Sequence, residues 1–134
     1  MAFSPISREV EQFIHDHIST VGQLEALLFL NAHADREWSA TQLSQALYCP
    51  PDLAAAWLSD LRRAGLLTVR EEAGREEAER LYRYNPGTRT LDHTVKNLGR
   101  AYTERKDAVI HLIFSGPSES IRSFADAFRI RKED

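Results

Sequence analysis

Residues 50–69 read PPDLAAAWLSDLRRAGLLTV, and this stretch decides the fold. Its two prolines suit the first turn of a helix, where a missing amide hydrogen has no partner to lose. Trp57, Leu58 and Leu61 then fall on one face at helical spacing. Gly65 follows the last helical residues and precedes a short apolar run. The stretch therefore predicts an amphipathic helix followed by a strand.

The flanking segments add a second helix and a hairpin. Residues 39–42 read SATQ, in which the serine hydroxyl and the glutamine amide can each bond the other residue's backbone N–H, so we expect a helix to start there. Strands are expected over 66–69 and 81–84, joined by the charged loop REEAGREEAER. The predicted order of elements is a helix, a tight turn, a second helix and a two-stranded wing. This is the layout of a winged helix-turn-helix domain.

Helices are also expected before this region, over 7–17 with Ser7 as its cap and over 21–33. The second of these is apolar on most sides and should form the centre of the core. The predicted fold is mainly α with a small β-hairpin wing, and it has additional N-terminal and C-terminal helices. We expect one domain over 1–134, with its core at about 21–86.

Beyond the wing, a long helix is predicted over 88–114 and a last one over 118–130, separated by SerGlyPro at 115–117. The run AVIHLIF at 108–114 is rich in Val and Ile and is also compatible with a strand. Its continuity with the preceding helical stripe favours a helix.

Composition limits the class of protein. An apolar content of 43% is typical of a globular chain, and a formal charge of −3 gives no overall attraction to phosphate. The single cysteine, Cys49, cannot form an internal disulfide, which favours a cytoplasmic location. The N-terminus lacks a secretory signal, and no apolar run approaches the roughly 20 residues that span a bilayer, so no membrane insertion is expected.

The block from Leu43 to Tyr84 resembles the winged-helix domain of MarR-type and PadR-type bacterial transcription regulators. It shares with them the capped helix, the recognition helix, the Gly-Leu-Leu strand entry and the wing. The resemblance implies transcription regulation and DNA binding, and, as in the PadR type, a dimer made by the long helix after the wing. It also implies that Tyr48 replaces a turn glycine and that Cys49 is a buried, inert core residue.

The whole chain, including the ending SGPSESIRSFADAFRIRKED, also resembles a group of uncharacterised bacterial proteins. That second resemblance implies no chemistry.

The predicted DNA-reading face is chemically unusual. By resemblance, the positions that face the groove are Asp52, Leu53, Ala55, Ala56, Ser59 and Asp60. None of these side chains has a guanidinium, ammonium or amide group, the groups that recognise a base through two hydrogen bonds. The alanines can contact thymine methyl groups. From residue 50 to residue 85, six arginines stand against seven carboxylates, a formal charge of −1.

Phosphate contacts depend on local placement more than on this sum. The candidate DNA-binding residues are Ser59, Arg62, Arg63, Arg75 and Arg80. The other interpretation is that the charges of the wing only solvate it and pair with each other. Since winged helices also bind proteins, a protein-protein interaction module that does not bind DNA is the alternative function.

Two apolar stripes predict contacts between helices. The first follows alternating steps of four and three residues, which favours a homodimer through Leu91, Val95, Leu98, Tyr102 and Val109. The second lies on the last helix and favours either packing or the docking of a partner protein through Ile121, Phe124 and Phe128.

We expect no enzyme activity, cofactor or metal site. The sequence has no Gly-rich phosphate loop, nucleophile elbow or paired-carboxylate motif. His15 and His17 are two residues apart, which places them on different faces of a helix, and the other histidines stand alone. Cys49 has no second cysteine or histidine at ligand spacing.

Overall fold

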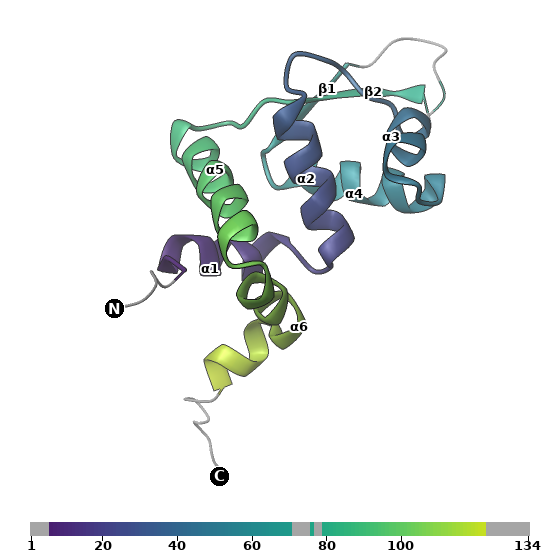
Figure 1. Ribbon diagram of the computed structural model, residues 1–134. Coiled ribbons are helices and arrows are strands. Elements are labelled where there is room, and N and C mark those ends of the chain that lie inside the picture. Colours follow the sequence, from purple (N-terminus) through teal and green to yellow (C-terminus); the bar gives the residue numbers. More distant parts are fainter. Residues whose placement is uncertain (1–5, 71–75, 77–78, 123–134) are drawn as a thin grey trace. The chain divides into compact units, whose positions relative to one another are not determined.

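The computed structural model describes the backbone of residues 6–70, 76 and 79–122, and side chains up to residue 115 (Figure 1). Within these ranges the elements are α1 (Arg8–His17), α2 (Val21–Ala32), α3 (Ala40–Leu47), α4 (Pro51–Arg63), β1 (Leu67–Arg70), β2 (Leu81–Tyr84), α5 (Arg89–Glu104) and α6 (Lys106–Arg122). The expected fold class is confirmed: mainly α, with a small antiparallel wing.

The chain divides into two compact units. The first is Gly22–Lys96, which we call the winged-helix unit. The second combines Met1–Val21 with Asn97–Asp134, and we call it the helical unit. The expected core at 21–86 lies almost entirely in the winged-helix unit. The single domain expected over 1–134 stays a prediction.

The helix-turn-helix begins at a capping box. Ser39 Oγ accepts a hydrogen bond from the backbone N–H of Gln42 at 3.1 Å, and Gln42 Oε1 accepts one from the N–H of Ser39 at 3.0 Å. These bonds satisfy donors that the first turn of α3 would otherwise leave unpaired. At its other end α3 stops at Tyr48, which adopts the left-handed conformation (φ 57°, ψ 48°). The predicted cap and end of this helix are therefore confirmed.

α4 packs on α3 and on β1 through one apolar face. Its buried residues are Ala54, Trp57, Leu58 and Leu61. α2 contributes Leu24, Leu27 and Leu30, each fully buried, as expected for the centre of the core. Burying a leucine side chain contributes about 1.5–3 kcal/mol, so this set supplies much of the stability of the unit.

The wing pairs Leu67 with Tyr84 and Arg70 with Leu81, and both strands lie within one residue of their predicted places. Gly65, shortly before β1, has a φ of 87°, a backbone conformation that favours glycine. Trp38 adds a bridge to Tyr82 through two backbone hydrogen bonds, so the loop before α3 extends the hairpin.

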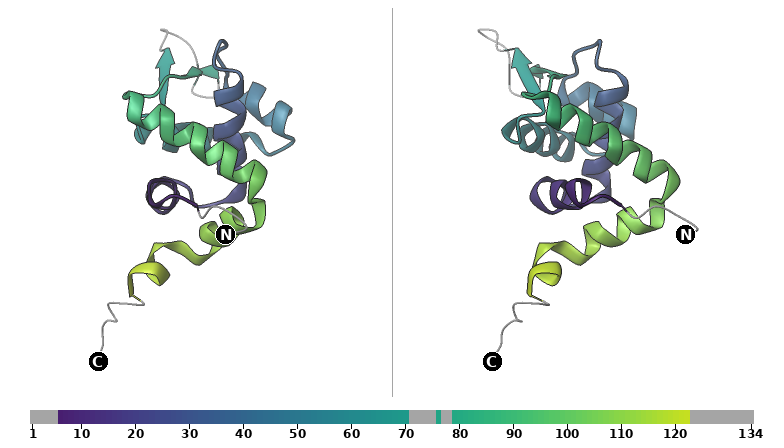
Figure 2. Two further views of the ribbon diagram at one scale, coloured as in Figure 1. Left: turned by 60° about the vertical axis from the view of Figure 1, so that its left-hand side comes forward. Right: turned by 90° about the vertical axis from the view of Figure 1, so that its left-hand side faces the viewer.

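In the helical unit, α1 packs beside α6, as both views of Figure 2 show. Ser7 Oγ caps α1 by accepting the N–H of Val10 at 3.2 Å, as predicted. Val10, Phe13 and Ile14 are buried.

The prediction of one helix over 88–114 was wrong, because the chain leaves helical geometry at Arg105 between α5 and α6. Arg105 occupies the position where the apolar stripe would need another apolar side chain. The i to i−4 backbone bonds persist on both sides: Arg105 N–H donates to Ala101 O, and Val109 N–H donates to Arg105 O. Helix, and not strand, is confirmed for 108–114.

SerGlyPro at 115–117 does not end the helix, contrary to the prediction, since α6 continues through it to Arg122. Pro117 removes one backbone donor, while Ser115 Oγ donates to His111 O at 2.9 Å in the turn before it. Residues 118–122 therefore belong to α6. The rest of the expected helix to 130, with Phe124 and Phe128, lies outside the described residues, and so does the side chain of Ile121. No helix of the described ranges has the length and apolarity to cross a bilayer.

Candidate nucleic-acid interface

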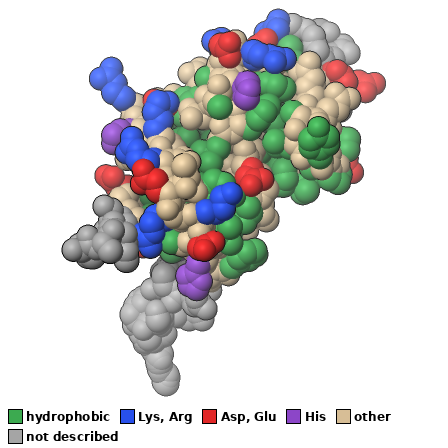
Figure 3. All heavy atoms as spheres, viewed as in Figure 1, with side chains coloured by type: hydrophobic (Ala, Val, Ile, Leu, Met, Phe, Trp, Pro, Cys, Tyr) green, Lys and Arg blue, Asp and Glu red, His purple; other side chains and the backbone are tan. Residues whose placement is uncertain are grey.

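The outer face of α4 is the candidate recognition surface. Asp52, Leu53, Ala56 and Asp60 are exposed along it, opposite the buried residues of the same helix. Leu53 is 43% exposed, and Tyr48, in the turn before α4, is 95% exposed. In Figure 3 hydrophobic side chains gather over the α3 and α4 end of the visible face. The surface at the start of the recognition helix is thus apolar, apart from Asp52.

Arg63 is held by its own helix. Its Nη2 lies 3.2 Å from Asp60 Oδ1 and donates to Ser59 Oγ at 3.2 Å. The side chain is nevertheless 72% exposed, so water and salt weaken the ion pair. These contacts place two predicted site residues, Ser59 and Arg63, together with Asp60 in one cluster whose charges cancel.

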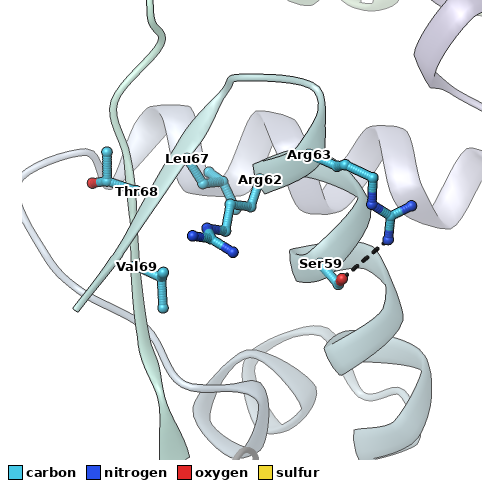
Figure 4. Close-up of a pocket in the computed structure, with 6 residues that line it drawn as sticks. All are labelled: Ser59, Arg62, Arg63, Leu67, Thr68 and Val69. Carbon is cyan, nitrogen blue, oxygen red and sulfur yellow. Dashed lines mark hydrogen bonds between the residues drawn. The ribbon is translucent and has the colours of Figure 1, made fainter. Parts of the chain in front are cut away.

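Arg62 points the other way, toward β1, as Figure 4 shows. It helps to line a hollow of about 440 Å³ between the end of α4 and the strand, together with Ser59, Arg63, Leu67, Thr68 and Val69. Arg62 is exposed. No side chain of the described ranges forms an ion pair or hydrogen bond with its guanidinium. Among the described side chains, Arg62 therefore presents a positive charge without a partner at the end of the recognition helix.

Most other arginines near the wing are engaged or cannot be placed. Arg70 binds Glu37 through two hydrogen bonds, Nη2 to Oε1 at 2.7 Å and Nε to Oε2 at 3.2 Å. Arg83 Nε donates to Ala34 O at 3.1 Å. Arg80 is part-exposed next to β2, and Arg75 lies outside the described residues. Among the described residues predicted to bind DNA, Ser59, Arg62 and Arg63 line the same hollow.

A polar network that the sequence reasoning missed ties the wing to α5. Tyr84 Oη donates to Asp92 Oδ1 at 2.8 Å, and Lys96 Nζ donates to the same oxygen at 3.0 Å. Lys96 also reaches Asn31 Oδ1 on α2 at 3.3 Å. The i, i+4 spacing of Asp92 and Lys96 could have indicated the ion pair, but not the tyrosine from β2.

The network shifts the pKa values of Asp92 and Tyr84. The bond from Lys96, followed by that from Tyr84, lowers the pKa of Asp92. Burial, followed by the bond to Asp92, raises the pKa of Tyr84 above its ordinary value of 10.0. At neutral pH the tyrosine is therefore a fixed donor to a carboxylate.

The predicted dimer stripe stays a prediction. Val95, Leu98 and Val109 are buried in the single chain. Leu91 and Tyr102 are part-exposed. Among the described side chains of α6, Phe114 is a large apolar group left in water; it is 78% exposed and was not predicted as a contact. The predicted stripe spans two helices, because the chain leaves helical geometry at Arg105 between α5 and α6.

Cys49 is part-buried, which is less than the resemblance implied. Burial still raises the pKa of its thiol, and a protonated thiol is a poor nucleophile. In the part of the chain that the structure describes, no three His, Cys, Asp or Glu side chains are grouped to hold a metal ion.

Solved structures with a similar fold include MepR from Staphylococcus aureus, a transcription regulator of the multidrug efflux pump MepA, and a MepR variant bound to an oligodeoxyribonucleotide. In both comparisons the identity is 17%, the match covers 91% of this chain and 87% of the other, and the TM-score is 0.51. The protein RV1404 from Mycobacterium tuberculosis is 15% identical, with 94% of this chain and 83% of that chain covered and a TM-score of 0.51. No protein-family model and no curated protein sequence matches the chain.

These similarities establish the fold class: a winged helix-turn-helix like that of MepR. At this identity they establish the fold alone.

Proposed function

We propose that this chain is a DNA-binding transcription regulator that holds duplex DNA mainly through phosphate contacts. The observation that carries the proposal is the guanidinium of Arg62, which has no partner among the described side chains and is placed between the end of the recognition helix and β1. In a bound winged helix the recognition helix enters the major groove and the wing approaches the backbone. Arg62 lies where both elements meet, so its charge would face a phosphate.

Ser59 and Arg63 assist in this proposal. Arg63 already has Asp60 as a partner, and it must exchange that carboxylate for a phosphate when DNA binds. The exchange costs little because the pair is exposed to water. Arg75 and Arg80 would add contacts from the wing.

The proposed regulator is a homodimer in the cytoplasm and has no catalytic activity. The dimer is supported by Phe114, whose exposed ring would leave water in an interface between two copies of α6. Leu91 and Tyr102 remain as further candidate contacts, while Ile121, Phe124 and Phe128 are candidates for this interface or for a protein partner.

A protein-protein interaction module is the second candidate function. It is favoured by the exposed Tyr48 and Leu53 and by Asp52, because a carboxylate on the groove-facing side opposes a polyanion but not a protein.

Binding to a mixed-sequence duplex separates the two functions. We expect the full chain to shift a labelled duplex at about 50 mM salt and to lose affinity steeply as salt is raised, because phosphate contacts release counterions. No binding at low salt would reject the regulator and leave the interaction module.

A further inference from the structure

The first two turns of α4 offer apolar groups where a base-reading helix commonly offers hydrogen-bond donors. Leu53 and Ala56 are three residues apart, so they are neighbours on the exposed face. Leu53 is 43% exposed, although Ala54 beside it is fully buried, so the outward position of Leu53 follows from the helix register.

The turn fixes this face. Ser39 and Gln42 cap α3, Tyr48 closes it in the left-handed conformation, and Pro51 begins α4. The N–H of Leu53 donates to Pro50 O at 3.1 Å. The backbone that carries the exposed leucine is therefore held by hydrogen bonds at both sides of the turn.

The major groove presents one apolar group to such a face, the C5-methyl of thymine. The other groups by which bases are distinguished in that groove are hydrogen-bond donors and acceptors. Leucine and alanine cannot bond to these edges, and covering a polar edge with an apolar side chain leaves it unsatisfied. Contact with a methyl group instead removes apolar surface of both partners from water.

We propose that Leu53 and Ala56 read the C5-methyl groups of pyrimidines in the major groove, so that the protein prefers sites rich in thymine. This proposal rests on the proposed function, because it requires the winged helix to dock on DNA. Arg62 supplies affinity without regard to sequence, and Leu53 and Ala56 supply the preference. The same methyl group is present in 5-methylcytosine, so the test must separate the two bases.

Four duplexes of equal length and charge provide the test: alternating A·T, the same duplex with uracil for thymine, alternating G·C, and the same duplex with 5-methylcytosine. Dissociation constants of the full chain are measured by fluorescence anisotropy at low salt. Phosphate contacts are common to each pair, so a ratio within a pair reports the methyl group. We expect uracil to weaken binding about fourfold for each methyl group lost from a contact.

Leu53→Ala should bring the ratio of uracil to thymine dissociation constants toward one, with the fold retained because Leu53 is exposed. Arg62→Ala is the matched control: it should weaken binding to every duplex and leave that ratio unchanged. The wild-type protein could also bind the 5-methylcytosine duplex more tightly than the cytosine duplex. If Leu53→Ala removes that preference, the same methyl readout extends to methylated sites. If only the thymine duplex is preferred, the methyl readout is restricted to thymine.

Equal affinity for the thymine and uracil duplexes would overturn the methyl readout while leaving the proposed function in place. Failure to bind any of the four duplexes at low salt would overturn both. A ratio unchanged by Leu53→Ala would show that the preference arises from DNA shape and not from this residue.

Discussion

Gly22, in the first turn of α2, lies against the indole ring of Trp57 on α4. A Cβ atom added at Gly22 would be 2.6 Å from both Cη2 and Cζ2 of the tryptophan, closer than real Cβ contacts come. Trp57 is a buried residue of α4, so its ring cannot move aside freely. The absence of a side chain at Gly22 therefore lets α2 approach the recognition helix closely.

Gly22→Ala should lower the free energy of unfolding by about 1–3 kcal/mol, the usual cost of overpacking a core. The measurement is urea denaturation followed by circular dichroism. The sign of this change is informative. Without a clash, the same substitution would raise the free energy of unfolding, because alanine is favoured over glycine in a helix by about 1 kcal/mol. The cost should shrink when Trp57→Phe is also present, since the clashing atoms are then gone. An equal cost in both backgrounds would contradict the contact.

Asp92 should make the winged-helix unit less stable as the pH falls into the acid range. Its folded pKa lies below the ordinary value of 3.8, so its contribution is present above pH 3.8 and is lost as pH falls through the folded pKa. Asp92→Asn should flatten the acid side of a plot of unfolding free energy against pH. A variant that keeps the wild-type slope below pH 3.8 would show that Asp92 does not contribute.

Tyr84 should make the winged-helix unit less stable as the pH rises into the alkaline range. Its folded pKa is raised, so its contribution is complete below pH 10.0 and is lost as pH rises toward the folded pKa. Tyr84→Phe removes the titrating hydroxyl and the bond to Asp92. We expect lower stability at neutral pH, by about 1–3 kcal/mol for a hydrogen bond to a charged group, and a shallower decline above pH 10.0. Deuterium exchange of the wing amides would show whether the wing loosens in this variant.

Local sequence signals were enough to predict the helix-turn-helix. The capping box at Ser39, the prolines before α4 and the apolar spacing of Trp57, Leu58 and Leu61 act over a few residues, and each appears in the structure as expected. The partners of Asp92 could not be foreseen, because Tyr84 reaches it from a strand whose position depends on tertiary packing.

The predicted bounds of α5 and α6 were wrong for a related reason. Periodicity identifies an apolar face but neither a break in the helix nor what covers the face, and the dimer through this face stays a prediction. Of the candidate site, sequence alone identified Ser59, Arg62 and Arg63. The i, i+3 spacing of Asp60 and Arg63 could have indicated their ion pair, but the sequence could not tell that Arg62 has no such partner among the described side chains.

If copies of the chain associate through α6, Phe114 is the residue to change. Phe114→Ser should yield a monomer in sedimentation at micromolar concentration with an unchanged melting temperature, because an exposed ring adds nothing to the monomer core. Val95→Asp is the contrasting variant: it buries an unpaired charge and should unfold the protein. A wild-type protein that sediments as a monomer would reject the dimer.

Arg62 and Arg63 are neighbours in sequence and carry the same charge, so a comparison of their alanine variants isolates the effect of placement. Arg62 faces the hollow beside β1, whereas Arg63 is bonded to Ser59 and Asp60 on its own helix. We expect Arg62→Ala to weaken binding to a mixed duplex more than Arg63→Ala does, and to reduce the slope of log affinity against log salt by about 0.9, the value of one phosphate contact. Asp60→Asn should strengthen binding, because it releases Arg63 and removes a charge that repels DNA. Salt titrations of the four proteins, wild type included, measure these slopes directly. Equal losses for the two arginines, with no gain from Asp60→Asn, would mean that DNA does not approach this end of α4.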